Sequence, residues 1–399
     1  MPRRLALVPL LVLAAACSDG AQQPLSPTGA PAAARAADGP GNYIVVLHDD
    51  QNPRSVAALL GINPRRVFTA SLQGFAGELD AGQLNALRHN PAVAYVEPDV
   101  EANRLFTTML FPVWGLDRID EPTLPLSSTF TYTSNGTGVI VYVLDTGVRK
   151  THNQFGGRAD YIANGLGGNF VGDAAVNAAD CHGHGTHVAG TVGGIGYGVA
   201  KNVQIRAGRV VNCVGNGTPS MVISAMDWII QNGVKPAVVN MSLGYGDVQS
   251  VRDMAGRLTY KGFTVVAAAG NGDFAGTPQD ACLQSPAGAP TAITVGSTTS
   301  TDNESSFSNY GTCVDILAPG SSVKSAGIAN DTAAYTRSGT SMATPHVAGV
   351  AAQYLATNPL ATPATVHNTI KAAGTLGVIT RHSLSVANGT PNRLLFTNY

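Results

Sequence analysis

Charged side chains are scarce in this chain of 399 residues. Lys, Arg, Asp and Glu together make up 12 % of it, and the formal net charge is only −1. Such a balance gives no electrostatic footprint for a nucleic acid or an acidic surface. Hydrophobic residues reach 44 %, so a sizeable core is expected rather than global disorder.

Long apolar runs are missing as well. Residues 5–16 form an apolar run of only twelve residues, whereas a membrane-spanning helix needs about 20. Because Arg3 and Arg4 precede this run, residues 1–17 are predicted to be an export signal peptide. Small residues before Cys17 are similar to a bacterial lipoprotein processing site. Lipidation of Cys17 and ordinary cleavage beside an incidental cysteine both stay open, so the precursor is either lipid-anchored or simply exported.

Cysteine is rare, with five residues in the chain. If Cys17 is removed or lipidated, Cys181, Cys213, Cys282 and Cys313 remain. An even number in an exported chain favours two disulfides over buried free thiols. Four cysteines allow three pairings, and their spacing does not choose among them.

After the signal peptide, the first quarter of the chain divides into a spacer and a small domain. Residues 18–40 are rich in Ala, Pro, Gly and Ser and read as a flexible linker. Residues 41–106 form a predicted α+β domain in the order β-α-β-β-α-β. Its strands are expected within residues 43–47, 67–79 and 93–97, and its helices begin after Asn52 and Asp80.

The rest of the chain, residues 107–399, alternates buried strands with helices. Apolar strands are expected at residues 138–144, 203–211, 237–241, 264–269 and 292–295, and helices at residues 184–193, 220–231 and 250–261. This alternation predicts an α/β domain with a parallel sheet covered by helices on both faces. Ligands of such sheets bind at the carboxyl ends of the strands.

Three motifs carry the residue types of acyl transfer. Asp145 ends a buried strand, His184 begins a helix, and Ser341 follows a small-residue turn that enters another helix. A neutral imidazole can activate a serine and later protonate the leaving amine, while a carboxylate orients that imidazole. The backbone N–H of Ser341 at a helix start offers one donor to an oxyanion, and Asn271 after a buried strand offers a second.

Two other readings use the same residues. The histidines between residues 182 and 187, beside Asp180 and Cys181, are compatible with a transition-metal hydrolase. Against it, the glycines break the helix that would fix such ligands, and the Asp145 and Ser341 motifs stay unexplained. A non-catalytic binding protein is the second alternative, and all four filled catalytic positions argue against it. His187 and His346 are expected to be structural, and His182 to be exposed.

Together these motifs resemble the subtilisin superfamily of serine proteases, specifically its proteinase K branch and aqualysin-like members. The order Asp145, His184, Asn271, Ser341 matches, and so do the segments at residues 114–120, 240–244, 306–311 and 391–395. The resemblance implies a subtilisin-like fold and a self-maturing serine endopeptidase. In it Asp145, His184 and Ser341 are the triad and Asn271 donates to the oxyanion.

The resemblance also implies a substrate groove. Two segments would pair with an extended peptide substrate, and the wall of the pocket for the residue before the cut would come from a third. They are Ser242, Leu243 and Gly244; Gly215, Asn216 and Gly217; and Ala267, Ala268 and Ala269. The polar substitutes of basic-specific relatives are not obvious here, which predicts broad specificity with an apolar or aromatic residue before the cut.

By the same resemblance the cysteines pair as Cys181–Cys213 and Cys282–Cys313, closing loops of about thirty residues worth roughly 3–4 kcal/mol each. Residues 41–106 resemble the family's propeptide, an intramolecular chaperone and inhibitor. It would be cut near residues 106–107, leaving its new end in the groove and releasing a secreted enzyme that we expect to be a monomer.

Structural calcium is the one cofactor that the resemblance implies. One site maps to backbone oxygens of Pro286 and Gly288 with the carboxylate of Asp315. A second site maps to Asp117, Asp120, Glu121, Ser127 and Thr129. Hard oxygen ligands in turns suit calcium. Asp173 and Asp180 are weaker candidates for a third ion, because their spacing departs from that of the relatives.

Overall fold

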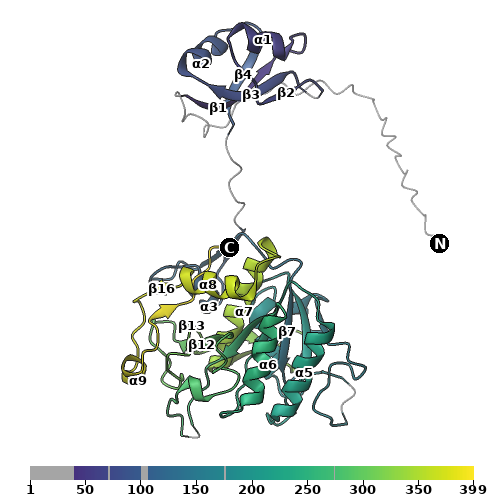
Figure 1. Ribbon diagram of the computed structural model, residues 1–399, viewed down its shortest axis with the longest axis vertical. Coiled ribbons are helices and arrows are strands. Elements are labelled where there is room, and N and C mark those ends of the chain that lie inside the picture. Colours follow the sequence, from purple (N-terminus) through teal and green to yellow (C-terminus); the bar gives the residue numbers. More distant parts are fainter. Residues whose placement is uncertain (1–39, 71, 100–106, 175–176, 274) are drawn as a thin grey trace, which may run out of the picture. The chain divides into compact units, whose positions relative to one another are not determined.

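The computed structural model describes residues 40–70, 72–99, 107–174, 177–273 and 275–399. The predicted signal peptide, Cys17, nearly all of the linker and the predicted cleavage segment before residue 107 lie outside these residues. The chain divides into two compact units, Met1–Asn103 and Arg104–Tyr399, which we describe one at a time (Figure 1).

The smaller unit is a four-stranded antiparallel sheet with two helices, in the strand order β2-β3-β1-β4. Its elements are β1 (Gly41–Leu47), α1 (Pro53–Leu59), β2 (Arg66–Phe68), β3 (Gly74–Leu79), α2 (Ala81–Arg88) and β4 (Val93–Pro98). The predicted β-α-β-β-α-β order is confirmed. Both helices also begin as predicted, because the side chains of Asn52 and Asp80 accept hydrogen bonds from backbone N–H groups of the first turn.

Alternation along β1 builds the core of this unit. Tyr43, Val45 and Leu47 point to one face and pack with Phe75 and other apolar residues of the strands and helices. The period of two in the sequence is therefore the period of the pleat.

The larger unit is built on a nine-stranded sheet in the order β16-β17-β13-β12-β11-β10-β7-β9-β8. All neighbouring pairs are parallel except β16 with β17. The strands are β7 (Ile140–Asp145), β8 (Ala159–Tyr161), β9 (Gln204–Arg209), β10 (Ala237–Met241), β11 (Thr264–Ala268), β12 (Ile293–Thr298), β13 (Ile316–Pro319), β16 (Thr375–Leu376) and β17 (Arg393–Leu394). The predicted parallel sheet is thus confirmed.

Helices cover both faces of this sheet. The helices of this unit are α3 (Trp114–Ile119), α4 (His184–Gly193), α5 (Pro219–Asn232), α6 (Gln249–Tyr260), α7 (Thr340–Thr357), α8 (Pro363–Ala373) and α9 (Ser383–Ala387), with short 3-10 turns η1 (Asn153–Phe155) and η2 (Ala281–Leu283). Val141 and Val143 of β7 face the core that includes α4 and α7. Tyr142 and Leu144 face the opposite core under α5 and α6, which lie side by side in Figure 1.

Two small antiparallel pairs complete the larger unit, β5 (Thr107–Leu110) with β6 (Thr129–Tyr132) and β14 (Val323–Ala326) with β15 (Ala334–Arg337). The sequence did not predict these short pairs, nor the last helices and edge strands. Within the described residues, the apolar length of each helix falls short of what crossing a bilayer requires.

Candidate active site

The carboxyl end of the sheet carries the predicted catalytic residues. Asp145 is the last residue of β7, and His184 is the first residue of α4. Asn271 follows β11 after a turn, and Ser341 lies in the first turn of α7. Four segments that are far apart in sequence therefore deliver their polar side chains to one edge, as expected for a parallel sheet.

Asp145 and His184 form a direct pair. Nδ1 of His184 lies 2.8 Å from Oδ1 of Asp145, and Asp145 is buried with 1 % of its surface exposed. Burial disfavours the imidazolium, but the attraction and hydrogen bond of Asp145 outweigh it, so the pKa of His184 is raised above its ordinary 6.5. The pair can therefore accept a proton and hold it in place.

A second carboxylate fixes the start of α4. Asp180 accepts hydrogen bonds from the backbone N–H groups of His182, Gly183 and Thr186, and from two threonine hydroxyls. One of these hydroxyls, that of Thr146, in turn accepts the N–H of Gly185 (2.9 Å). Asp180 thus serves as a capping residue for the helix of His184, a role that the sequence did not reveal and that uses up the oxygens considered for a third ion.

Ser341 enters α7 through Gly339. Gly339 has φ of 156°, and a Cβ there would lie 3.4 Å from Nδ2 of Asn271. The hydroxyl of Ser341 donates to the carbonyl oxygen of Ser242 (3.0 Å), and the hydroxyl of Ser242 donates to the carbonyl oxygen of Ser341 (2.9 Å). These reciprocal bonds tie the predicted nucleophile to one predicted wall of the groove.

Two hydrogen bonds accepted by Oδ1 fix the orientation of the Asn271 side-chain amide. Oδ1 accepts from the backbone N–H of Thr340 (2.8 Å) and from its hydroxyl (2.9 Å). The NH₂ group is therefore turned to the other side and left available as a donor, beside the N-terminus of α7. An amide N–H₂ group at this place is compatible with the predicted role as an oxyanion donor.

A cleft of about 310 Å³ lies over the Asp145–His184 pair. It is lined by both segments predicted to bind the substrate backbone, which are Gly215, Asn216, Gly217, Ser242, Leu243 and Gly244, and by Val211, Tyr245 and His182. The residues at 267–269 are not in this lining. All three are buried in or directly after β11; Ala267 packs in the core under α5 and α6, and Ala269 packs in a smaller cluster with Leu317 and Leu394.

The other histidines divide into two kinds. His187 and His346 are fully buried and bond to backbone carbonyl groups, as expected for structural residues. His182 was expected to be exposed, and that expectation is wrong. It is half-buried and lines the cleft, because the disulfide at Cys181 and the Asp180 cap hold its loop against the site.

Both disulfides predicted from the resemblance are present, Cys181–Cys213 and Cys282–Cys313, with separations of 32 and 31 residues. The first joins the loop before α4 to the loop that carries Gly215. Arg209 lies beside it, fully buried, and both of its NH groups bond to Asp173 (2.8 and 2.6 Å). Asp173 is therefore an ion-pair partner in this structure.

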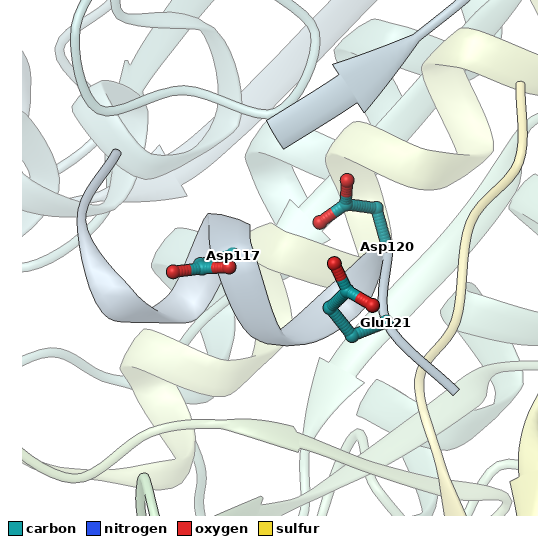
Figure 2. A group of neighbouring side chains, drawn as sticks. All are labelled: Asp117, Asp120 and Glu121. Carbon is teal, nitrogen blue, oxygen red and sulfur yellow. The ribbon is translucent and has the colours of Figure 1, made fainter. Parts of the chain in front are cut away.

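The acidic cluster at α3 fits a cation. Figure 2 shows the carboxyl groups of Asp117, Asp120 and Glu121 along the end of this helix, and ligand atoms of all three lie within 4.8 Å of one another. Oδ1 of Asp120 is buried and has no hydrogen-bond partner among the described residues. Burial raises the pKa of Asp120 to about 7, and the neighbouring carboxylates add to the rise. The hydroxyls of Ser127 and Thr129 bond to each other next to Asp117.

The expected site at Asp315 has a different arrangement. Its Oδ1 lies 2.7 Å from the ammonium group of Lys371 and 3.1 Å from Nε2 of His367, and its Oδ2 accepts the N–H of Thr294 (3.0 Å). The backbone oxygen of Pro286 accepts the N–H of Ala289 (2.9 Å). Both carboxylate oxygens are occupied and the charge is matched inside the protein, so these residues do not fit calcium as they stand.

Comparisons with known proteins agree with the geometry. Residues 136–390 match the model of the subtilase family, and residues 61–103 match that of the peptidase inhibitor I9 family. The chain is 47 % identical to an extracellular serine proteinase of Thermus sp. (strain Rt41A), over 86 % of this chain and 79 % of that protein. It is 44 % identical to alkaline serine exoprotease A of Vibrio alginolyticus, over 87 % of this chain and 62 % of that protein.

A solved structure is similar as well. The crystal structure of a cold adapted subtilisin-like serine proteinase has 46 % identity and a TM-score of 0.66, and the match covers 72 % of this chain and 99 % of that one. With the parallel sheet, the inhibitor domain and the paired His184 and Asp145, this chain belongs to the subtilase family of serine proteinases.

Proposed function

We propose that this protein is a secreted, self-maturing serine endopeptidase whose nucleophile is Ser341. The observation that carries the proposal is the 2.8 Å contact between His184 and a buried Asp145 in the wall of the cleft. In this reading His184 is the general base and then the general acid, and Asp145 fixes its tautomer.

Substrate binding would prepare the nucleophile. The hydroxyl of Ser341 has one hydrogen, which it donates to the carbonyl oxygen of Ser242. An extended substrate that pairs with residues 242–244 supplies an N–H to that carbonyl. The hydroxyl hydrogen is then displaced and can turn to His184.

Attack on the peptide carbonyl would create an oxyanion. The backbone N–H of Ser341 and the NH₂ group of Asn271 are the two donors offered to it. Loss of one such donor costs about 10²–10³ in rate. The metal-hydrolase alternative is not favoured, because His182, His184 and His187 do not form a ligand cluster among the described residues.

The I9 domain supports the maturation scheme. Residues 41–106 would act as chaperone and inhibitor, and the enzyme would cut its own chain near residue 107. The polar substitutes of basic-specific relatives are not obvious in this sequence, so the proposal includes broad specificity with an apolar or aromatic residue before the cut. Export, monomeric state and any lipid on Cys17 belong to the same proposal.

Calcium would be held at α3. Asp117, Asp120 and Glu121 are the candidate ligands, with Ser127 and Thr129 nearby. The ion would bind the unpartnered Oδ1 of Asp120 and relieve the repulsion among the three carboxylates. Its contribution is to stability, since none of these residues lines the cleft.

The decisive experiment is maturation of Ser341→Ala. This variant should stay as uncut precursor by intact mass and N-terminal sequencing, while Ser224→Ala, an exposed serine of α5, should mature normally. A serine-directed phosphonylating reagent should label the wild type and abolish its activity. Normal processing of Ser341→Ala, or immediate loss of activity on brief chelation with no effect of the reagent, would refute the proposal.

A further inference from the structure

Asparagine followed by glycine is a chemically labile pair in a protein chain. The main-chain nitrogen of the glycine can attack the side-chain amide of the asparagine, because glycine has no side chain to hinder the approach. All such pairs of this chain lie within the described residues, so their hydrogen bonds can be compared. There are six, and their asparagines are Asn135, Asn164, Asn216, Asn232, Asn271 and Asn388.

In five of the pairs the amide of the asparagine is held. Oδ1 accepts hydrogen bonds in Asn135, Asn164 and Asn271. Nδ2 donates to a helix carbonyl oxygen in Asn232 and Asn388. The glycine N–H groups after Asn232 and Asn271 are bonded as well, at 2.8 and 2.9 Å. These bonds must break before the attack, so the fold protects the five pairs, and with them the proposed oxyanion donor.

Asn216 is the exception. It is exposed, and within the described residues neither its side-chain amide nor the N–H of Gly217 has a hydrogen-bond partner. The turn before it is fixed, because the N–H and the carbonyl oxygen of Asn216 bond to Asn212 at 2.9 and 2.8 Å. Both reacting groups of this pair are therefore free, while the turn keeps Asn216 and Gly217 in the wall of the cleft.

We propose that Asn216 is a spontaneous deamidation site that limits the working life of the substrate groove. The nitrogen of Gly217 forms a bond to Cγ of Asn216, and the side-chain amide leaves as ammonia, taking up the proton that the nitrogen loses. A cyclic imide results. Water then opens this ring at either of its carbonyl groups and gives aspartate or isoaspartate. One water is consumed and one ammonia released for each asparagine converted.

Isoaspartate changes the groove through its backbone. The chain then runs through the former side chain, so one extra carbon atom separates residues 216 and 217. Residues 215–217 are proposed to pair with an extended substrate, and such pairing depends on register. A lost backbone hydrogen bond costs about 0.5–1.5 kcal/mol, so kcat/KM on an extended peptide should fall about 2–12-fold for each bond. This consequence rests on the proposed function, whereas the deamidation itself needs no catalytic residue.

The first test follows the chemistry alone, in mature enzyme that has been phosphonylated so that it cannot digest itself. During storage at pH 8, the peptide containing Asn216 should gain about 1 Da and accept methyl groups from an isoaspartate methyltransferase, before any peptide with another Asn-Gly pair. Asn216→Ser should show neither change at this position. Asn388→Ser removes a held pair outside the cleft and should behave like the wild type. No gain at Asn216, or an earlier gain at another pair, would overturn the inference.

The second test measures the effect on the groove. Active wild type, Asn216→Ser and Asn388→Ser are stored in the same way, and their active sites are counted by titration with the phosphonylating reagent. On an extended peptide, kcat/KM per active site should fall as isoaspartate accumulates in the wild type and Asn388→Ser, and should stay at its own starting value in Asn216→Ser. A short ester that does not reach residues 215–217 should be cleaved at a constant rate per site by all three.

Two outcomes of this second test contradict the inference. One is an equal decline in Asn216→Ser, and the other is an undiminished kcat/KM in wild type that has accumulated isoaspartate. Failure of the proposed function is distinguishable from both. It would show as a reagent that does not label Ser341, while the mass gain at Asn216 would still occur.

Discussion

Replacing Asp120 by Asn should change the stability of the protein in opposite directions with and without calcium. Without the ion, Asp120 is a half-buried carboxylate beside Asp117 and Glu121, and its charge is unfavourable. Asn keeps an oxygen for the N–H of Thr131, which Oδ2 of Asp120 accepts at 2.7 Å. We therefore expect the variant to be more stable than the wild type in chelator and less stable in excess calcium.

The magnitude follows from the pKa of Asp120, which burial raises from 3.8 to about 7. At about 1.4 kcal/mol per unit this sets an upper limit of about 4 kcal/mol for the cost of the charge at pH 8. Solvent reaches part of the side chain, so about 1–3 kcal/mol is expected. At about 2–4 °C per kcal/mol for a large domain, the shift in Tm is about 2–12 °C.

The assay is calorimetry at pH 8 of mature enzyme whose serine has been phosphonylated, so that it cannot digest itself. Wild type and Asp120→Asn are each measured in EGTA and in millimolar calcium. Asp315→Asn is the matched control, because Asp315 is neutralised by Lys371; it should lose stability equally in both buffers. The reasoning fails if calcium does not stabilise the wild type, or if it stabilises Asp120→Asn as much.

Three further outcomes are expected. The kcat/KM should rise with pH, with a midpoint above pH 6.5, since Asp145 raises the pKa of His184. Asp145→Asn should move this midpoint to lower pH and reduce kcat by a factor on the order of 10⁴. An unchanged midpoint would show that a group other than His184 titrates. His187 and His346 have pKa values lowered to about 4 by burial, so each contributes stability above pH 6.5 that is lost as pH falls to 4, by up to about 3 kcal/mol. Tm measured from pH 7 to 4 should fall less steeply in His346→Asn, and equal slopes would contradict this. Replacing Cys181 and Cys213 together by Ala should cost about 2–4 kcal/mol in denaturant unfolding, more than replacing Ser224 by Ala.

The sequence predicted the main strands of the sheet well, because buried parallel strands consist of continuous runs of apolar residues. The runs at residues 237–241 and 264–269 became β10 and β11 almost unchanged. The run at 138–144 became β7 only from Ile140, because Gly138 has φ of +83° and lies in the turn before the strand. Short strands such as β16 and β17 have two residues each, too few for any period to register.

The site shows a different limit. Motifs indicated which residue types meet at the edge of the sheet, but not the capping role of Asp180, whose partners are mostly backbone N–H groups that have no signature in a sequence. The sequence also could not predict the contact between Lys371 and Asp315, because 56 residues separate them in the chain. The resemblance to the family predicted Asp315 as a calcium ligand, but it could not show that Lys371 of this chain neutralises that carboxylate.

The catalytic geometry consequently depends on residues that do no chemistry. His184 is aimed by Asp145, but the helix that carries it is capped by Asp180. Ser341 is held by Ser242, whose hydroxyl also accepts from the buried side chain of Asn240 (3.0 Å). His184 and Ser341 thus come from different elements, and each is fixed by a hydrogen bond to a residue of another segment. Because these bonds are short-range and directional, losing one should misplace a single reacting group while the packed sheet beneath stays folded.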